Sequence, residues 1–136
     1  MDEDVSLTRS LIGDRPDEAV VLTDAMVKEP IYMINCFTVP AGQGDIFLTR
    51  WKDNVRAMAN QPGFIRSRMF RALDPNAMVS FINFVQWGSG EALHEARKNP
   101  EWRAAVQRMF DDENLRVTPR PMVYVPALVV DAGDEL

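Results

Sequence analysis

The sequence predicts an α+β domain whose elements follow the order β-α-β-β-α-β, the ferredoxin-like arrangement. Four segments rich in β-branched and aromatic residues alternate with helical patterns in this order, and turn residues separate them. The first and third predicted strands are also apolar on both faces, whereas two helices cover only one face of a four-stranded sheet. We therefore expect a homodimer in which a second copy of the sheet covers the other face.

The first predicted strand covers residues 31–39 and ends at a Pro-Ala-Gly turn. Residues 43–60 then carry an apolar stripe at spacings of four, four and three, which is typical of an amphipathic helix. The stripe consists of Phe47, Trp51, Val55 and Met58. The pair Pro62-Gly63 ends this helix, and residues 64–73 form the second predicted strand.

The third predicted strand covers residues 78–87 and follows an Asp-Pro-Asn turn. Two N-cap residues come next: Ser89 begins a helix, and Asn99, followed by a proline, restarts it. The last strand is expected over residues 122–130, where prolines indicate an edge or bulged strand. These prolines are Pro121 and Pro126.

Composition and charge divide the chain of 136 residues into three parts. Residues 1–29 form an acidic arm of unassigned role, because eight acidic residues oppose three basic ones and give a charge of -5. A short strand near residues 19–23 is the one element expected in this arm. Residues 30–130 form the single folded domain, and residues 131–136 form a C-terminal tail.

The charge distribution also limits the partners of the protein. The chain outside the arm is neutral, with 12 acidic and 12 basic residues, which argues against a nucleic-acid partner. No apolar run reaches the ~20 residues of a membrane span, and the acidic start is unlike a signal peptide. The single Cys36 excludes an internal disulfide and a cysteine-based zinc cluster. We expect a soluble cytoplasmic protein that does not bind membranes.

The third predicted strand holds the most informative residues, an amide and an indole among apolar neighbours. Side chains alternate along a strand, so Asn83 and Trp87 share one face with Phe81 and Val85. A buried polar group is costly unless protein, water or a ligand hydrogen-bonds it. Asn83 is therefore a candidate ligand-binding residue, although a structural amide bonded to neighbouring backbone is the alternative. For Trp87 the alternative is a large core residue.

Other polar residues carry weaker expectations. Alternation along the second strand places Arg66 and Arg68 on one face with Phe64 and Phe70, and ion pairs within the dimer are favoured over substrate binding there.

His94 is the single histidine of the chain. It recurs at helical spacing with charged residues, which predicts a solvated polar stripe rather than a base or a metal ligand. The charged members of the stripe are Glu91, Arg97, Lys98 and Glu101. Whether His94 takes part in a site stays open.

Three segments resemble the antibiotic biosynthesis monooxygenase (ABM) family: Asn35 within residues 33–37, the turn at residues 61–64, and residues 83–87. The resemblance covers about residues 30–130 and implies a dimeric α/β barrel. One branch of the family oxidises anthrone-type polyketides with O₂ and without metal, haem or flavin. The haem-degrading branch uses a histidine on the second helix as iron ligand.

The resemblance implies the cofactor-free branch, because the position of the iron ligand is about Val106 in this chain. It implies a monooxygenase that needs no cofactor, takes O₂ as co-substrate and oxidises an anthrone-like polyphenol to a quinone in antibiotic biosynthesis. The catalytic residues would be Asn35, Asn83 and Trp87. The residues expected to contact the small aromatic substrate are Phe37, Phe81, Val85 and Leu93.

Two departures leave the acid-base chemistry open. Some members carry a tyrosine proton donor where Leu93 stands and an arginine near Val106. The alternatives are a haem- or planar-ligand-binding protein of the same fold, an isomerase or cyclase that needs no O₂, and a pathway accessory protein.

Overall fold

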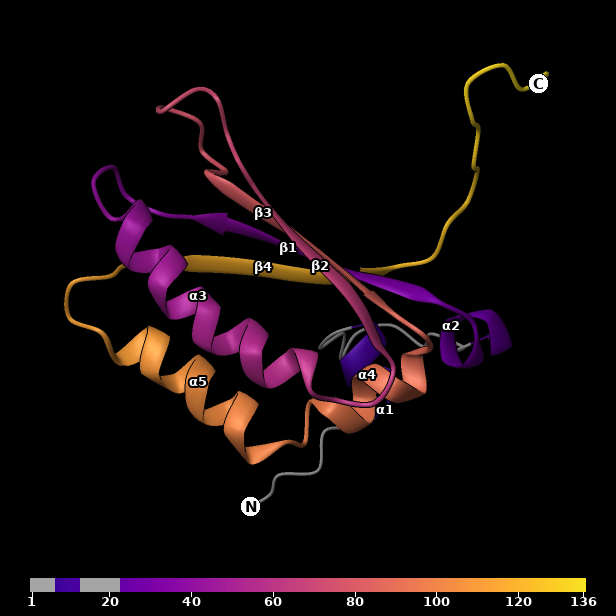
Figure 1. Cartoon of the computed structure of the whole chain (residues 1–136), viewed down its shortest axis with the longest axis horizontal. Helices are drawn as coiled ribbons and strands as arrows, with labels where there is room; N and C mark the ends of the chain where they lie inside the picture. Colours follow the sequence, from indigo (N-terminus) through magenta and orange to yellow (C-terminus); the bar gives the residue numbers. More distant parts are fainter. Residues whose placement is uncertain (1–6, 13–22) are drawn as a thin grey trace, which may run out of the picture.

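The computed structural model describes residues 7–12 and 23–136, which form a four-stranded antiparallel sheet with helices (Figure 1). The strands are β1 (Ile31–Thr38), β2 (Phe64–Arg71), β3 (Phe81–Trp87) and β4 (Thr118–Tyr124). The helices are α1 (Leu7–Ile12), α2 (Asp24–Lys28), α3 (Gly44–Ala59), α4 (Gly90–Ala96) and α5 (Pro100–Asp111). The spatial order β2-β3-β1-β4 confirms the predicted α+β, ferredoxin-like fold.

The sheet has one face covered by helices and one face without them in the described part of the chain. Figure 1 shows α3 and α5 side by side below the sheet, and α4, α1 and α2 gathered at one end. The outer face is the one opposite α3 and α5. Its side chains include Phe70 and Met122, which are 49% and 57% exposed.

The inner face, under the helices, holds the apolar core. Along β3 the residues Phe81, Asn83, Val85 and Trp87 are all buried, as the alternation predicts. Aromatic rings fill the space between the sheet and α3. The ring centroids of Phe37 and Phe47 lie 4.8 Å apart, for example.

The helix boundaries follow from the capping residues that the sequence shows. Ser89 accepts a hydrogen bond at Oγ from the backbone N–H of Ala92 (3.1 Å), and Asn99 accepts one from Trp102 (2.9 Å). Gly63, in the turn before β2, has a φ of 87°, which favours glycine. A Cβ at this position would also collide with Ala92 of α4.

The second strand contains a bulge that overturns one expectation from its sequence. The register shifts between Phe64, which pairs with Trp87, and Arg66, which pairs with Gln86. Phe64 therefore lies on the inner face, where its ring meets Trp87 edge-on, and not on the face of Arg66 and Arg68. Strict alternation fails here because one residue is inserted into the ladder.

The last strand also differs from its predicted range. It covers Thr118–Tyr124, whereas residues 122–130 were expected. It is an edge strand, as its prolines indicate, and it pairs with β1 alone. Residues 125–136 leave the sheet without forming a strand, and Figure 1 shows this segment extending away from the body.

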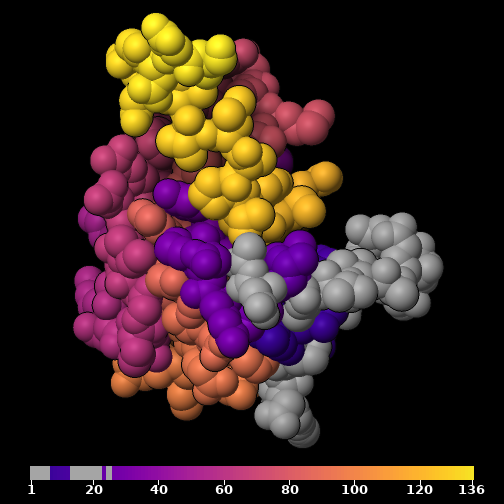
Figure 2. Space-filling model, turned by 90° about the vertical axis from the view of Figure 1, so that its right-hand side faces the viewer, coloured from indigo at the N-terminus to yellow at the C-terminus, as the bar shows by residue number. Residues whose placement is uncertain are grey.

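The N-terminal part packs against the end of the domain where α4 lies. A Cβ on Gly90 of α4 would meet Leu11 of α1 and the backbone oxygen of Met26 of α2, so the three helices are in close contact. Figure 2 looks at this end of the molecule, with the N-terminal helices in indigo and purple. The strand expected near residues 19–23 falls almost entirely outside the described residues. The expectation of no other element in the arm is wrong, because the arm contains the helices α1 and α2. In the described ranges, no helix has the length and apolar character needed to cross a membrane.

Candidate active site

Two asparagines face each other across adjacent strands on the inner face of the sheet. Asn35 of β1 and Asn83 of β3 are directly paired in the antiparallel register, which brings their Cβ atoms to about 5 Å in such pairs. Asn83 is fully buried, and Asn35 is partly buried. The fold thus places together two residues that lie far apart in the sequence.

The orientation of both amides follows from the donors that contact them. The Ser67 hydroxyl of β2 donates to Asn83 Oδ1 over 2.8 Å, and the backbone N–H of Arg120 in β4 donates to Asn35 Oδ1 over 3.1 Å. Each amide oxygen is therefore engaged, and the NH₂ group of each side chain is the remaining donor. Asn83 Nδ2 is buried without a partner among the described residues.

The prolines of β4 explain the contact to Asn35. Pro119 and Pro121 have no backbone N–H, and they stand opposite Phe37 and Asn35 in the register. Arg120, between them, directs its N–H to the Asn35 side chain. The edge strand thereby holds a candidate catalytic residue.

Trp87 lies on the same face as Asn83 but further along β3. Its side chain is fully buried, and its Nε1 has no hydrogen-bond partner among the described residues. The ring of Trp87 stacks on that of Trp102 in α5, with centroids 6.1 Å apart and an angle of 23°. Phe64 meets Trp87 edge-on, with centroids 5.6 Å apart.

A cavity of about 180 Å³, here called the inner cavity, lies between the inner face of the sheet and the helices α3 and α5. Most of its lining is aromatic or aliphatic, including Phe37, Trp51 and Trp102. The polar side chains in the lining are Asn35, Asn54 and Arg97. Such a lining suits a flat apolar ligand that carries a few polar groups.

The predicted site residues do not all reach this cavity. Asn35 and Phe37 line it, whereas Asn83 is absent from the described lining and lies beside it as the register partner of Asn35. Val85 and Leu93 are fully buried and are absent from the described lining. The same holds for Phe81, whose ring packs on Phe47 (centroids 4.8 Å apart). Trp87 is likewise absent, but it supports Trp102, which is present.

Asn54 of α3 is a polar residue of the cavity that the sequence reasoning missed. Its side chain is fully buried, and its Nδ2 donates to the backbone oxygen of Arg50 over 3.1 Å and to Met109 Sδ over 3.8 Å. Its Oδ1 has no partner among the described residues. Helical spacing could have predicted that Asn54 is buried, because it lies three residues after Trp51 and four before Met58, on the apolar stripe.

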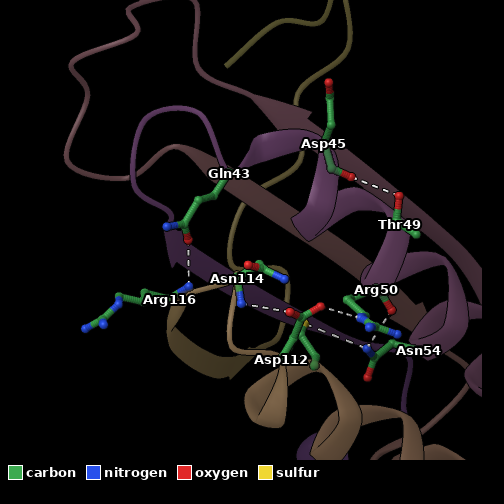
Figure 3. A network of polar contacts seen from close by, with 9 residues as sticks. Gln43, Asp45, Thr49, Arg50, Asn54, Asp112, Asn114 and Arg116 are labelled. Carbon is green, nitrogen blue, oxygen red and sulfur yellow. Dashed lines mark hydrogen bonds and ion pairs between the residues drawn. The ribbon is translucent and has the colours of Figure 1, made fainter.

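A polar network beside Asn54 joins α3 to the end of α5 (Figure 3). Arg50 Nε and Asp112 Oδ2 form an ion pair at 2.8 Å, and the backbone N–H of Asn114 donates to Asp112 Oδ1 at 2.9 Å. The Asn114 N–H and then the Arg50 guanidinium hold the pKa of Asp112 below its ordinary value. The network joins the two helices that cover the inner cavity.

Arg97, the C-cap residue of α4, is the second polar residue that was missed. Its Nη2 donates to Met33 Sδ over 3.4 Å, and its Nε is buried without a partner among the described residues. Burial lowers the pKa of Arg97 from its ordinary value, but arginine remains protonated in proteins. No carboxylate contact of Arg97 is found in the described part of the chain.

Arg97 and His94 therefore do not form the solvated stripe that the helical spacing predicted. Helix α1 covers this part of α4, and the hydroxyl of the buried Ser10 lies 3.0 Å from His94 Nδ1. Both nitrogen-containing side chains are partly buried. The periodicity of α4 alone could not reveal a covering helix from the arm.

The residues of the inner cavity do not fit a haem-iron site. Val106 lines the cavity and is the residue where the family resemblance would place an iron ligand, but its side chain has no donor atom. His94 is absent from the described lining, and its Nδ1 is engaged by Ser10. Within the described ranges, no group of three His, Cys, Asp or Glu residues is placed to hold a metal ion.

The fold and the paired asparagines agree with the comparison to protein families. The family model described as antibiotic biosynthesis monooxygenase matches residues 30–108. This match covers more than half of the chain, and the protein belongs to that family of monooxygenases. The search of curated protein sequences finds no match.

Solved structures show the same fold at low sequence identity. A putative monooxygenase from Shewanella loihica has 23% identity and a TM-score of 0.61, over 74% of this chain and 97% of its own. SnoaB from Streptomyces nogalater, a cofactor-independent oxygenase, has 20% identity and a TM-score of 0.63, over 75% and 97%. An MhuD mutant with two manganese protoporphyrin IX molecules per active site has 22% identity and a TM-score of 0.58, over 75% and 99%.

Proposed function

We propose that this protein is a cofactor-independent monooxygenase that uses O₂ to oxidise an anthrone-like polyphenol, a polyketide intermediate of antibiotic biosynthesis, to a quinone. One observation carries the proposal. Asn35 and Asn83 face each other beside an aromatic cavity, and protein donors engage both amide oxygens, which leaves two NH₂ groups as donors. Donors arranged in advance stabilise an anion that develops on a substrate oxygen.

The chemistry begins with loss of a proton from the acidic CH₂ of the anthrone. The resulting anion places charge on the ring oxygen, where Asn35 and Asn83 donate hydrogen bonds. One electron then passes to O₂, and the carbon radical and superoxide combine to form a C–O bond. Protonation gives a hydroperoxide. Loss of the second C–H proton and cleavage of the O–O bond yield the ketone and water, so CH₂ and O₂ become C=O and H₂O.

Trp87 has two roles in this proposal. Its ring supports Trp102, which forms a wall of the inner cavity. Its Nε1–H is a buried donor without a partner among the described residues, and we assign it to the peroxide oxygen. The proton acceptor of the first step is a water molecule or the phenolate of the substrate itself.

We also propose that the protein acts as a homodimer through the outer face of the sheet. A groove of about 270 Å³ on this face is lined by aromatic and cationic side chains, among them Phe84, Arg66 and Arg68. Exposed apolar side chains on a sheet without a covering layer favour association with another surface.

The experiment that tests the function is O₂ uptake by the purified, cofactor-free protein with a hydroxylated anthrone. We expect protein-dependent uptake with quinone formation, and Asn83→Ala should lower kcat by about a hundredfold, as for loss of one donor to a developing anion. Trp87→Phe should also lower kcat, since it removes the indole N–H but keeps an aromatic ring.

Two controls accompany these variants. A blank without protein measures the slow autoxidation of the anthrone, and Asn60→Ala removes an exposed amide at the end of α3. Asn60→Ala should retain full activity. Uptake equal to the blank for the wild-type protein, or full activity of Asn83→Ala, would show that the proposal is wrong.

A further inference from the structure

A second cavity lies next to the inner cavity, at the β4 edge of the sheet. This arm cavity has a volume of about 270 Å³, and its lining includes Leu11 and Ile12 of α1, and Ile31 of β1. Ile31 and Met33 belong to the same inward face of β1, and Met33 lines the inner cavity. The two cavities therefore follow each other along the strand.

Arg97 lines both cavities, as does Pro121. The guanidinium group thus lies at the junction between the space under α3 and α5 and the space under α1. Its Nε is buried without a partner among the described residues, and its Nη2 contacts only the weak acceptor Met33 Sδ.

Arg97 is partly buried, and burying part of a cation without an anionic partner is costly, because arginine holds its proton and stays charged. No aspartate or glutamate occurs in the described lining of either cavity. The missing partner is therefore an anion from outside this part of the protein. A carboxylate matches the planar guanidinium best, since it accepts two parallel hydrogen bonds.

We propose that Arg97 and the arm cavity form a subsite for a carboxylate-bearing substituent of the substrate. The inference rests on the proposed function, because it assumes that the ring system occupies the inner cavity. Met33, which contacts Arg97, and Asn35 lie two residues apart on one strand face, about 7 Å along the strand. A fused-ring phenol spans this separation, with the ring oxygen that gains charge at Asn35 and Asn83 and its carboxylate at Arg97.

Two flat probes of the same ring system test this inference without turnover. Anthraquinone-2-carboxylate carries the anion, and 2-(hydroxymethyl)anthraquinone is its neutral counterpart. Binding is followed by the fluorescence of Trp51 and Trp102, which line the inner cavity. For the wild-type protein we expect the carboxylate probe to bind at least tenfold more tightly than the neutral one.

Variants locate the origin of that preference. Arg97→Met removes the charge but keeps a long apolar side chain, and it should weaken the carboxylate probe at least tenfold with little effect on the neutral probe. Arg97→Lys should retain part of the preference. Lys98→Met is the matched control, because it removes the exposed cation next in sequence, whose partner is Glu95, and it should leave both affinities unchanged. Ile12→Trp fills the arm cavity and should weaken the carboxylate probe selectively.

The outcomes separate this inference from the proposed function. Equal affinity of the wild-type protein for both probes overturns the anion subsite, even if O₂ uptake with an anthrone is observed. A preference that persists in Arg97→Met also overturns it, as does an equal loss for both probes, which would indicate a purely structural arginine. If neither probe binds, no tricyclic site exists and the inference is wrong. If Arg97→Met fails to fold, Arg97→Lys and Ile12→Trp test the same preference, and a preference unchanged in both variants would overturn the inference.

Discussion

Asn35 and Asn83 receive their hydrogen bonds from different kinds of donor. A side-chain hydroxyl, that of Ser67, engages Asn83, whereas a backbone N–H, that of Arg120, engages Asn35. In both cases the donor determines which end of the amide is free. Ser67 is thus a positioning residue in the proposed mechanism, since it acts on the substrate only through Asn83.

The variant Ser67→Ala should lower kcat by about tenfold and leave KM nearly unchanged, because the Asn83 amide loses the bond that orients it. Ser67→Thr retains the hydroxyl and should restore most of the activity. Steady-state O₂ uptake with the anthrone measures both constants. An unchanged kcat in Ser67→Ala would contradict the positioning role.

At the level of residues, the sequence permitted part of the site to be predicted. The burial of Asn83 and Trp87 follows from the alternation of side chains along β3 and is confirmed. The adjacency of β1 and β3 in the predicted topology is what brings Asn35 beside Asn83. The burial of Arg97 does not follow from helical spacing. It depends on α1, a short helix whose contact with α4 joins residues more than 80 positions apart, such as Ser10 and His94.

At the level of elements, the helices α3, α4 and α5 were predicted closely, whereas α1 and α2 of the N-terminal arm were not predicted. The caps Ser89 and Asn99 act through local hydrogen bonds, which the sequence shows directly. The bulge in β2 and the early start of β4 arise from pairing with neighbouring strands. Local patterns do not contain that information, because register depends on partners that are distant in the chain.

The ion pair between Arg50 of α3 and Asp112 at the end of α5 should make the stability of the fold depend on pH. The pKa of Asp112 is lower in the folded protein than in an unfolded chain, so its carboxylate stabilises the fold above the ordinary carboxyl pKa. This stabilisation is lost as the pH falls through the folded-state pKa, below about 4. Asp112→Asn should lower the Tm at pH 7. The difference in Tm between this variant and the wild-type protein should become smaller as the pH falls below about 4.

Thermal unfolding followed by circular dichroism between pH 7 and pH 3 measures this effect. Asp53→Asn is the control, since Asp53 pairs with Arg56 on the exposed surface of α3, where ion pairs contribute little. A Tm difference between Asp112→Asn and wild type that stays constant over this range would contradict the assignment.

At the level of the whole molecule, the outer face of the sheet predicts the oligomeric state. Phe84 and Phe70 form an edge-to-face pair on this face, with ring centroids 5.5 Å apart, although both are partly exposed. A single chain has a mass of 15.4 kDa. We expect a dimer in solution at twice this mass, because a second sheet would cover these rings.

Phe84→Arg should convert the dimer to a monomer, because a further cation beside Arg66 and Arg68 would be buried in the interface without an anionic partner. Light scattering coupled to size exclusion measures the mass. Leu73→Arg is the control, since Leu73 is fully exposed in the turn between β2 and β3, and this variant should remain dimeric. A wild-type protein of 15.4 kDa would show that the prediction of a dimer is wrong.

The main-chain donor at position 120 has a consequence for how the sequence is free to change. Because the Arg120 N–H, and not its side chain, holds Asn35, any residue except proline at this position supplies the same hydrogen bond. Position 67 is more restricted, since only a side chain with a donor can hold Asn83. Related sequences should therefore contain many residue types at position 120, whereas position 67 should contain only residues with a side-chain hydrogen-bond donor.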